Sequence, residues 1–371
     1  MPNKKIKIGV LFGGKSAEHE VSLQSARNVI DALDKNKYEV IPIGIDKNGK
    51  WQLNTTANYL LNTNNPKLIK LNKSNKEVVL YAQGQGALTS INNNLGVKEK
   101  IDVIFPVMHG PFGEDGSMQG LLKLANVPFV GPSVLGSAVG MDKDMMKRLL
   151  RDAGIPIGKF IAIKENDKID FNKIKKELGL PMFIKPANMG SSVGISKVRN
   201  EKEFKKGIAL AFKFDRKILI EEFIQGREIE CALLGNDIPM ASVPGEIVTN
   251  QDFYSYDAKY IDTGSQSIIP APIDKKTTKK IQELAIKTFQ TLNCEGMSRV
   301  DFFLLTPQWR GKKNGAVLVN EINTIPGFTD ISMYPKLWEA SGIPVSKLLD
   351  RLIELAIERF EKEKKLKTTV S

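Results

Sequence analysis

The stretch AVLVNEINTIPGFTD, residues Ala316 to Asp330, decides the fold that we expect, because it joins an apolar strand to a turn. Its first residues are typical of a buried strand, and Pro326 and Gly327 end that strand in a turn. Side chains alternate across a strand, so Glu321 and Asn323 are expected on one face. Together they offer hard oxygen ligands at a short spacing, which suits Mg²⁺ and poorly suits zinc or copper.

A second apolar run, Met297 to Leu305, carries polar residues with the same parity. Arg299 and Asp301 fall on one face of this predicted strand. If the two strands pair, three oxygen ligands and one arginine converge. The alternative is that these are solvent-facing positions on two half-buried strands. Matching polar faces among large apolar residues favour a metal site.

The bulk composition indicates a globular protein with two or three domains. The chain has 371 residues, of which 42% are hydrophobic and 26% charged. No apolar segment is long enough for a secretory signal or a membrane span, so we expect no membrane association and a cytoplasmic location. Cys231 and Cys294 are expected to be buried thiols. Two cysteines and two histidines disfavour a His/Cys metal cluster or thiol catalysis.

The net charge of +12 permits nucleic-acid binding. The charge is dispersed, however, and the one dense run, Glu361 to Lys367, is mixed in sign. A nucleic-acid-binding protein would need clustered Lys and Arg with aromatic residues, and the sequence has no such cluster. We therefore favour a solvated basic surface that includes sites for phosphate and carboxylate substrates.

Residues 1–131 predict an open parallel α/β domain. Lys5 to Phe12 is a strand, Ser22 is a candidate N-cap of the following helix, and Tyr38 to Asp46 is the next strand. The spacing GxGxxG is absent, which disfavours a dinucleotide-binding fold. Glu18 lies on the loop where such sheets bind ligands. The polar segment 54–100 is predicted to be an insertion of small strands or hairpins without catalytic residues.

The remaining sequence predicts two α+β lobes, residues 132–223 and residues 224–371, with a cleft between them. The loop Gly190 to Gly194 can place backbone N–H groups and two hydroxyls over phosphates. A hairpin of small residues that binds no ligand explains this stretch equally well. Lys185 favours the phosphate-binding loop. The connector Glu221 to Ile224 could hold an adenine through its backbone. Thr249 to Ser267 is polar and aromatic, which favours a lid over an active site.

With these residues together, the chain resembles the D-alanine:D-alanine ligases of the ATP-grasp superfamily over nearly its whole length. Seven motifs occur in the family's order: GGKSAEHEVS (13–22), HGPFGEDGSMQG (109–120), MDKDMMK (141–147), IKPANMGSSVGISKV (184–198), FYSYDAKY (253–260), RVDFF (299–303) and NEINTIPGFTDISM (320–333). The resemblance implies an ATP-grasp fold, with an open parallel α/β domain followed by two α+β lobes that enclose the nucleotide.

The resemblance also implies an activity. Two D-alanines would be joined through a D-alanyl phosphate at the expense of ATP, giving D-alanyl-D-alanine for peptidoglycan synthesis. It implies two Mg²⁺ ions, for which Mn²⁺ can substitute, and a homodimer. No nucleophilic side chain is needed, so the work is positioning and charge neutralisation. D-Alanine:D-lactate and D-alanine:D-serine ligases of the same family are the alternatives.

Site residues are carried over by matching each motif. ATP is expected at Lys143, Lys185, Ser191, Ser192, Glu221, Glu222, Phe223, Ile224, Glu228, Phe253 and Lys259. The metal ions are expected at Asp301, Glu321 and Asn323. The substrates are expected at Glu18, His109, Arg299, Gly327, Ser332 and Met333. Catalytic roles are expected for Glu18, Ser191, Tyr260, Arg299 and Ser332.

Two features of the match concern the second substrate and the phosphate contacts. Tyr260 corresponds to a lid tyrosine, which favours an amine as the second substrate over D-lactate. Asn188 and Met189 replace the charged or polar pair that often precedes the glycine-rich loop in the family, so phosphate contacts at this point are not carried over.

Overall fold

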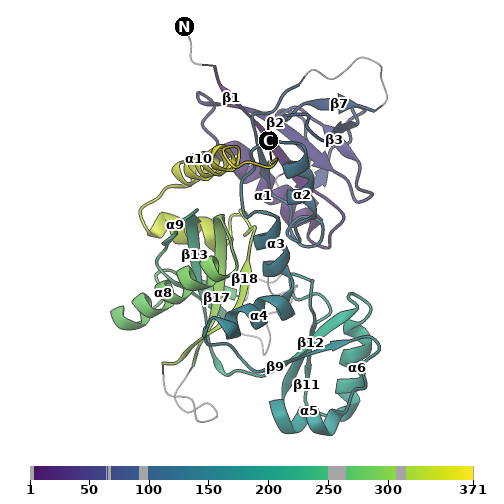
Figure 1. The fold of residues 1–371 in the computed structure, drawn as a ribbon, viewed down its shortest axis with the longest axis vertical. Helices are drawn as coiled ribbons and strands as arrows, with labels where there is room; N and C mark the ends of the chain where they lie inside the picture. The colour runs from purple at the N-terminus through teal and green to yellow at the C-terminus, as the bar shows by residue number, and fades with distance from the viewer. Residues whose placement is uncertain are drawn as a thin grey trace.

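The computed structural model describes residues 4–63, 65, 68–91, 99–249, 265–305 and 315–370. Figure 1 shows its N-terminal part at the top, the sheet with β13, β17 and β18 in the middle, and the sheet with β9, β11 and β12 at the lower right. Among the described residues these are the three main sheets, and the two lower ones are antiparallel. The predicted mixture of α/β and α+β parts is confirmed.

The N-terminal sheet has the strand order β3-β2-β1-β8. Its three parallel strands are β1 (Ile6–Gly13), β2 (Tyr38–Ile45) and β8 (Val103–Pro106), and β3 (Trp51–Leu53) pairs antiparallel to β2. Helix α1 (His19–Ala32) crosses from β1 to β2, and α2 (Ser117–Leu124) follows β8. This is the open parallel arrangement that the sequence predicts, and ligands bind such sheets at the carboxyl ends of the strands.

Ser22 is not the N-cap of helix α1, so that prediction is wrong. The helix begins at His19 and no side chain caps it. Ser22 lies one turn inside, where its buried hydroxyl accepts a hydrogen bond from the Gly13 N–H at 2.7 Å and donates one to the Val107 carbonyl. The side chain satisfies two buried backbone groups instead of a helix end, and it fixes α1 to the ends of two strands.

The described part of segment 54–100 forms two small hairpins, as predicted. One pairs β4 (Leu60–Leu61) with β5 (Lys70–Leu71), and the other pairs β6 (Val78–Leu80) with β7 (Leu88–Ser90). Val78, Leu80 and Leu88 pack into the same apolar cluster as Ile43 of the main sheet. The segment therefore extends the N-terminal domain.

The central sheet has the order β11-β10-β12-β9. Its strands are β9 (Phe160–Lys164), β10 (Met182–Pro186), β11 (Ser196–Val198) and β12 (Lys217–Glu222), and it carries α5 (Phe171–Leu178) and α6 (Glu201–Ala211). Strand β9 begins at Phe160. Residues before it belong to the other lobe, because the Val319 N–H donates to the Pro156 carbonyl at 2.8 Å.

The C-terminal sheet has the order β16-β15-β13-β17-β18, with β14 (Met240–Ala241) added to β13. The long central strands are β13 (Gly226–Gly235), β17 (Gly296–Leu305) and β18 (Val317–Asn323), and β15 (Gly245–Thr249) and β16 (Ser265–Ile268) extend the edge. Helices α3 (Val134–Met141), α4 (Lys143–Asp152), α8 (Lys275–Thr291) and α9 (Met333–Ala340) pack on this lobe. The predicted domain limits place α3 and α4 with the central lobe, and those limits stay a prediction.

The last helix, α10 (Val345–Glu363), connects the C-terminal lobe to the N-terminal domain (Figure 1). Its apolar residues share one buried cluster with β1, α1 and α9. Arg359, which is 6% exposed, donates to the carbonyls of Phe129 and Gly131 at 2.8 and 2.5 Å. Since these contacts cross the boundary, the N-terminal domain is held at a fixed position against the loop that follows β18.

Cys231 and Cys294 are free, buried thiols, as predicted. Burial raises the pKa of Cys231 to about 12 and raises that of Cys294 as well. Neither thiol is therefore a nucleophile at neutral pH. Among the described residues, no helix is long and apolar enough to cross a membrane.

Candidate active site

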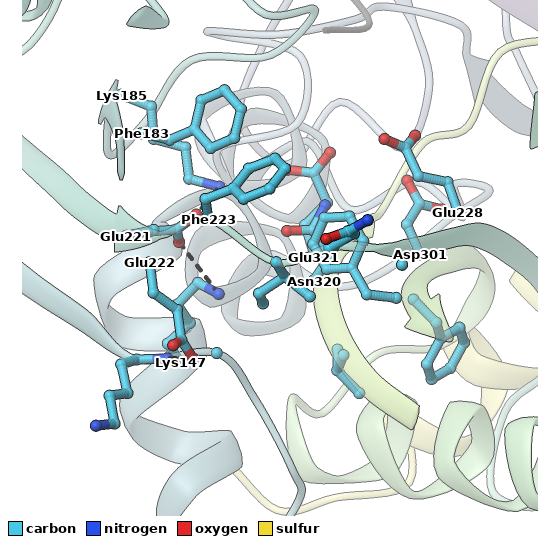
Figure 2. Close-up of a pocket in the computed structure, with 18 of the residues that line it drawn as sticks. Lys147, Phe183, Lys185, Glu221, Glu222, Phe223, Glu228, Asp301, Asn320 and Glu321 are labelled. Atoms are coloured by element: carbon cyan, nitrogen blue, oxygen red, sulfur yellow. Dashed lines mark hydrogen bonds and ion pairs between the residues drawn. The ribbon is translucent and has the colours of Figure 1, made fainter. Parts of the chain in front are cut away.

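Two cavities meet between the three sheets. The larger, of about 310 Å³, lies between the central and C-terminal sheets, and Figure 2 shows Glu221, Lys147 and Lys185 on one side of it and Glu228 and Asp301 on the other. The smaller, of about 160 Å³, is lined by the N-terminal domain and the loop after β18. Ser192, Ile195, Glu230 and Glu321 line both. A ligand in one cavity can therefore reach a ligand in the other.

The two strands with matching polar faces do pair. In the antiparallel register of β17 and β18, Arg299 lies opposite Asn323 and Asp301 lies opposite Glu321. The side-chain amide of Asn323 donates to Asp301 Oδ2 at 2.9 Å. The four side chains whose convergence the sequence predicts are brought together at the junction of the cavities.

Arg299 is the centre of this polar group. Its Nε and Nη2 donate to both oxygens of Asp301 at 2.7 and 2.8 Å, and Nε lies 3.0 Å from a Glu230 oxygen. Burial alone would lower the pKa of Arg299, but the two carboxylates raise it well above its usual value. Glu230 has no role in the sequence analysis. Glu230 lies opposite Asp301 in the pairing of β13 with β17, and this pairing cannot be read from the sequence.

The oxygen donors at this junction fit Mg²⁺ or Mn²⁺ by type. Asp301, Glu321 and Asn323 supply only carboxylate and amide oxygens, which are hard ligands. In the described part of the chain, no group of three or more His, Cys, Asp or Glu side chains is arranged to hold a metal ion. The expected set has two acids and one amide, and Arg299 pairs with one of the two acids.

Three buried lysines pair with two partly exposed acids: Lys147 and Lys185 lie at the larger cavity and Lys143 at the smaller one. Glu221 lies 2.6 Å from Lys185 and 3.1 Å from Lys147, and Glu321 lies 3.8 Å from Lys143. Although burial raises the pKa of Glu221, Lys147 and Lys185 lower it below its usual value. Two lysines thus face the single carboxylate of Glu221, and this local positive charge favours a phosphate group.

Lys147 is a site residue that the sequence analysis missed. It lies four residues after Lys143 on α4, and this spacing places both side chains on one face of the helix. The same spacing could have identified it inside the motif MDKDMMK. Burial lowers the pKa of Lys143 and of Lys147. By contrast, the pKa of Lys185 is raised because Glu221 and Glu321 outweigh its burial.

Aromatic side chains form an apolar wall of the larger cavity. The rings of Phe183 and Phe223 are 6.1 Å apart, and Lys197 lies 4.6 Å from the Phe223 ring centre. Such a surface accepts a flat base by stacking. Glu222 is anchored beside this wall, because its carboxylate accepts the Lys159 N–H at 2.9 Å and its own N–H donates to the Lys159 carbonyl at 3.1 Å.

The glycine-rich loop holds two consecutive serines in the left-handed backbone region. Ser191 and Ser192 have φ values of 48° and 60°, and the Ser191 hydroxyl donates to Glu18 of the N-terminal domain. A Cβ at Gly190 would lie 2.8 Å from a Glu18 oxygen, so a larger residue there would displace the Glu18 carboxylate. The loop and the N-terminal domain therefore meet over the smaller cavity.

The departure at Asn188 and Met189 has a structural explanation. Asn188 donates its backbone N–H and its side-chain amide to Asp215 at 2.7 and 2.9 Å. The Met189 carbonyl accepts from Lys143 Nζ at 2.8 Å. In this chain the pair attaches the base of the glycine-rich loop to neighbouring segments.

The smaller cavity is lined by the other expected substrate residues. Glu18, His109, Arg299, Gly327, Ser332 and Met333 all contribute to it. Glu114 lies beside them and was not predicted. Its carboxylate accepts the N–H groups of Gly110 and Ile325 at 2.6 and 3.2 Å, and burial, reinforced by Glu18, raises its pKa to about 8. Phe253, Lys259 and Tyr260 lie outside the described residues.

The comparisons with known proteins agree on one family. Residues 7–132 match the family model of the D-ala D-ala ligase N-terminus, and residues 149–354 match that of the C-terminus. The D-alanine–D-alanine ligase of Oceanobacillus iheyensis is 54% identical over 370 residues, with 99% of each chain covered. The D-alanine–D-alanine ligase A of Escherichia coli is 51% identical over 371 residues, covering 99% of this chain and 100% of the relative.

Solved structures give the same result. The D-alanine–D-alanine ligase of Coxiella burnetii superimposes with a TM-score of 0.83 at 40% identity, covering 97% of this chain and 96% of that one. The VanG D-Ala:D-Ser ligase of Enterococcus faecalis does so with a TM-score of 0.81 at 38% identity, covering 95% and 100%. This chain belongs to the D-alanine–D-alanine ligase family, whose members are ATP-dependent ligases with the ATP-grasp fold.

Proposed function

We propose that this protein joins two D-alanine molecules with consumption of ATP, releasing D-alanyl-D-alanine, ADP and phosphate for peptidoglycan synthesis. One observation carries the proposal: a cavity sized for a nucleotide and a smaller one meet at Arg299, Asp301 and Glu321. The two cavities let a γ-phosphoryl group and a small carboxylate reach each other.

ATP would bind in the larger cavity. Its base would lie against Phe183 and Phe223, with Glu221 accepting from the exocyclic amine and the backbone of Glu222 to Ile224 pairing with the ring. Glu228 would hold the ribose. Lys143, Lys185 and the loop with Ser191 and Ser192 would hold the phosphates. Phe253 and Lys259 are proposed to act from the lid.

The first step would form an acyl phosphate. A carboxylate oxygen of the first D-alanine attacks the γ-phosphorus, the bond from phosphorus to the ADP oxygen breaks, and ADP leaves. Glu18 would hold the ammonium group of this substrate, with His109 beside it. No side-chain nucleophile takes part, so the residues act by orientation and by fixed charge.

The second step would form the peptide bond. The neutral amine of the second D-alanine attacks the acyl carbon, and the carbon–oxygen bond to phosphate breaks. Arg299 and the Gly327 N–H would stabilise the negative charge on the acyl oxygen, while Ser332 and Met333 line the place of the second carboxylate. Tyr260 is proposed to close this site from the lid, near Glu18 and Ser191.

Two Mg²⁺ ions, replaceable by Mn²⁺, are part of this proposal. Asp301, Glu321 and Asn323 would hold them. When bound, the ions would offset the repulsion between the triphosphate and the substrate carboxylate. This role suits the hard oxygen donors that the paired strands supply.

D-Alanine is not the only candidate for the second substrate. The VanG structure, a D-Ala:D-Ser ligase by its title, superimposes well on this chain, so D-serine is the second candidate. Mass spectrometry of the products from an equal mixture of D-alanine, D-serine and D-lactate with ATP and Mg²⁺ separates the three. We expect D-alanyl-D-alanine. A dominant mixed product, or no ATP turnover with D-alanine, would refute the proposal.

The protein is proposed to act in the cytoplasm as a homodimer, with small-molecule substrates and without nucleic acid. Part of the positive charge would serve the site, since Lys147 and Lys185 of the larger cavity and Lys143 of the smaller one would lie beside the triphosphate. A mobility shift with DNA or RNA that persists at moderate salt would contradict this.

A further inference from the structure

The turn between β18 and α9, Ile325 to Phe328, is held by side chains of the N-terminal domain. At Ile325, the N–H donates to Glu114 at 3.2 Å and the carbonyl lies 3.1 Å from His109 Nδ1. At Phe328, the N–H donates to the Ser25 hydroxyl oxygen at 3.1 Å. The first and last residues of the turn are thus fixed by a different domain.

The donor and the acceptor of each hydrogen bond in this network follow from the groups that take part. A carbonyl only accepts, so His109 Nδ1 must carry the proton that is shared with Ile325. Burial lowers the pKa of His109, which keeps the ring neutral and leaves Nε2 as an acceptor. Ser25 lies 3.3 Å from Nε2 and donates its hydroxyl proton there, while its oxygen accepts the Phe328 N–H. Ser25 is fully buried, so bulk water does not reach these hydrogen bonds.

Asn28 completes the attachment one turn further along α1. Its side-chain amide donates to the Phe328 carbonyl at 2.9 Å and to Asp330 at 2.9 Å. Ser25 and Asn28 are three residues apart on the helix, so they lie on the same face. Both backbone groups of Phe328 are therefore bound by α1.

Within the turn, one N–H group has no hydrogen-bond partner in the part of the chain that the structure describes. Pro326 has no N–H, the N–H groups of Ile325 and Phe328 are used, and that of Gly327 is left. Gly327 lines the smaller cavity, and a Cβ there would lie 2.7 Å from Ser332 Oγ. The attachment of the turn leaves this donor available at the substrate cavity.

We propose that Ser25 and Asn28 are positioning residues for the second reaction step, acting through the turn on the Gly327 N–H and on Ser332. This inference rests on the proposed ligase function. Neither residue lines either cavity. They hold the turn where its free donor meets the acyl oxygen, so the N-terminal domain sets the geometry of a site that lies in the C-terminal lobe.

The test uses the full-length enzyme and the variants Ser25→Ala and Asn28→Ala. The loss of one oxyanion donor lowers kcat by about 10²- to 10³-fold, so a displaced donor is expected to lower kcat by at least about tenfold. The KM for D-alanine at the second subsite should rise, and the KM for ATP should stay within about twofold. Asn28 is only partly buried, so its variant keeps the test valid if Ser25→Ala folds poorly.

Ser22→Ala is the matched control. Ser22 is a fully buried serine on the same helix and also bridges two backbone groups, but these belong to Gly13 and Val107. It should lower the unfolding temperature without changing kcat or the KM for D-alanine. A kcat as low as that of Ser25→Ala would show that general destabilisation explains the loss, and would overturn the proposal.

A second measurement separates this inference from the ligase function. Amide hydrogen exchange in peptides that span the turn should be faster in Ser25→Ala and Asn28→Ala than in the wild type or Ser22→Ala. Unchanged exchange with unchanged kinetics overturns the positioning role. If the wild type fails to turn over D-alanine, the ligase function is lost, and the exchange result alone decides whether α1 holds the turn.

Discussion

Lys147 Nζ lies 3.1 Å from Oε1 of Glu221, inside the cavity that we assign to ATP. Lys185 approaches the other oxygen of the same carboxylate at 2.6 Å. Both lysines are buried, and two cations on one acid leave net positive charge in a region with little water. This arrangement keeps Glu221 ionised as a hydrogen-bond acceptor, and it attracts the phosphates at the same time.

Lys147→Met is therefore expected to weaken ATP binding selectively. The substitution keeps most of the length of the side chain and removes one charge next to Glu221. Loss of a charge-assisted contact of about 1.5–3 kcal/mol predicts a rise of roughly tenfold or more in the KM for ATP. Initial rates at varied ATP and saturating D-alanine measure it. Lys206→Met, at an exposed position on α6, is the control, and an equal KM in the two variants would contradict the assignment.

The attachment of the glycine-rich loop to Asp215 gives a second prediction. Asn188→Ala removes one of two hydrogen bonds to this carboxylate at the base of the loop. We expect a higher KM for ATP, because a loosened loop holds phosphates less well. Asn200→Ala removes the N-cap of α6 and costs about 1 kcal/mol of stability without touching the loop. If both variants alter the KM equally, the loop attachment is not the cause.

Glu321→Gln is expected to stop turnover and to leave the fold intact. Glu321 sits at the junction of both cavities and is partly exposed, so the amide disturbs no packed core. Loss of a metal ligand should lower kcat by at least about 10²-fold, by analogy with removal of other charge-stabilising groups. Binding of Mn²⁺ with ADP, followed by electron paramagnetic resonance, should weaken too. Glu283→Gln on α8 serves as the exposed control, and an active Glu321→Gln enzyme refutes the metal assignment.

The buried carboxyl of Glu114 makes stability depend on pH. Burial raises its pKa from 4.5 to about 8, so the folded state binds a proton more tightly than the unfolded state does. The stabilisation is complete below the unfolded pKa and is lost as pH rises through about 8. We expect the unfolding free energy of the wild type to fall between these two pH values.

Glu114→Gln tests this pH dependence, because glutamine does not titrate. The variant should show a flatter dependence of unfolding temperature on pH than the wild type over the same range. Its overall stability will also be lower, since one amide cannot accept both the Gly110 and Ile325 N–H groups. The diagnostic quantity is the slope with pH, and equal slopes in the two proteins would contradict the raised pKa.

Much of the site was predictable because it depends on local periodicity. The alternation of a strand places Glu321 with Asn323 and Arg299 with Asp301, whatever surrounds them. The glycine-rich loop was recognisable because its residues are small. Helical spacing could also have found Lys147. The capping of α1 was misread, because a serine near a helix start can cap the helix or bond to a distant strand, and only packing decides which.

The sequence by itself determined which side chains share a face and which chemistry they can do: oxygen ligands on two strands, lysines beside a flexible loop, and no reactive thiol. Tertiary structure alone decided which faces meet. Glu230 opposite Asp301, Glu114 against Ile325, and Ser25 and Asn28 on Phe328 are contacts between segments far apart in the chain. The physical reason is that local periodicity fixes direction within an element, whereas the packing of buried surfaces between elements fixes distance.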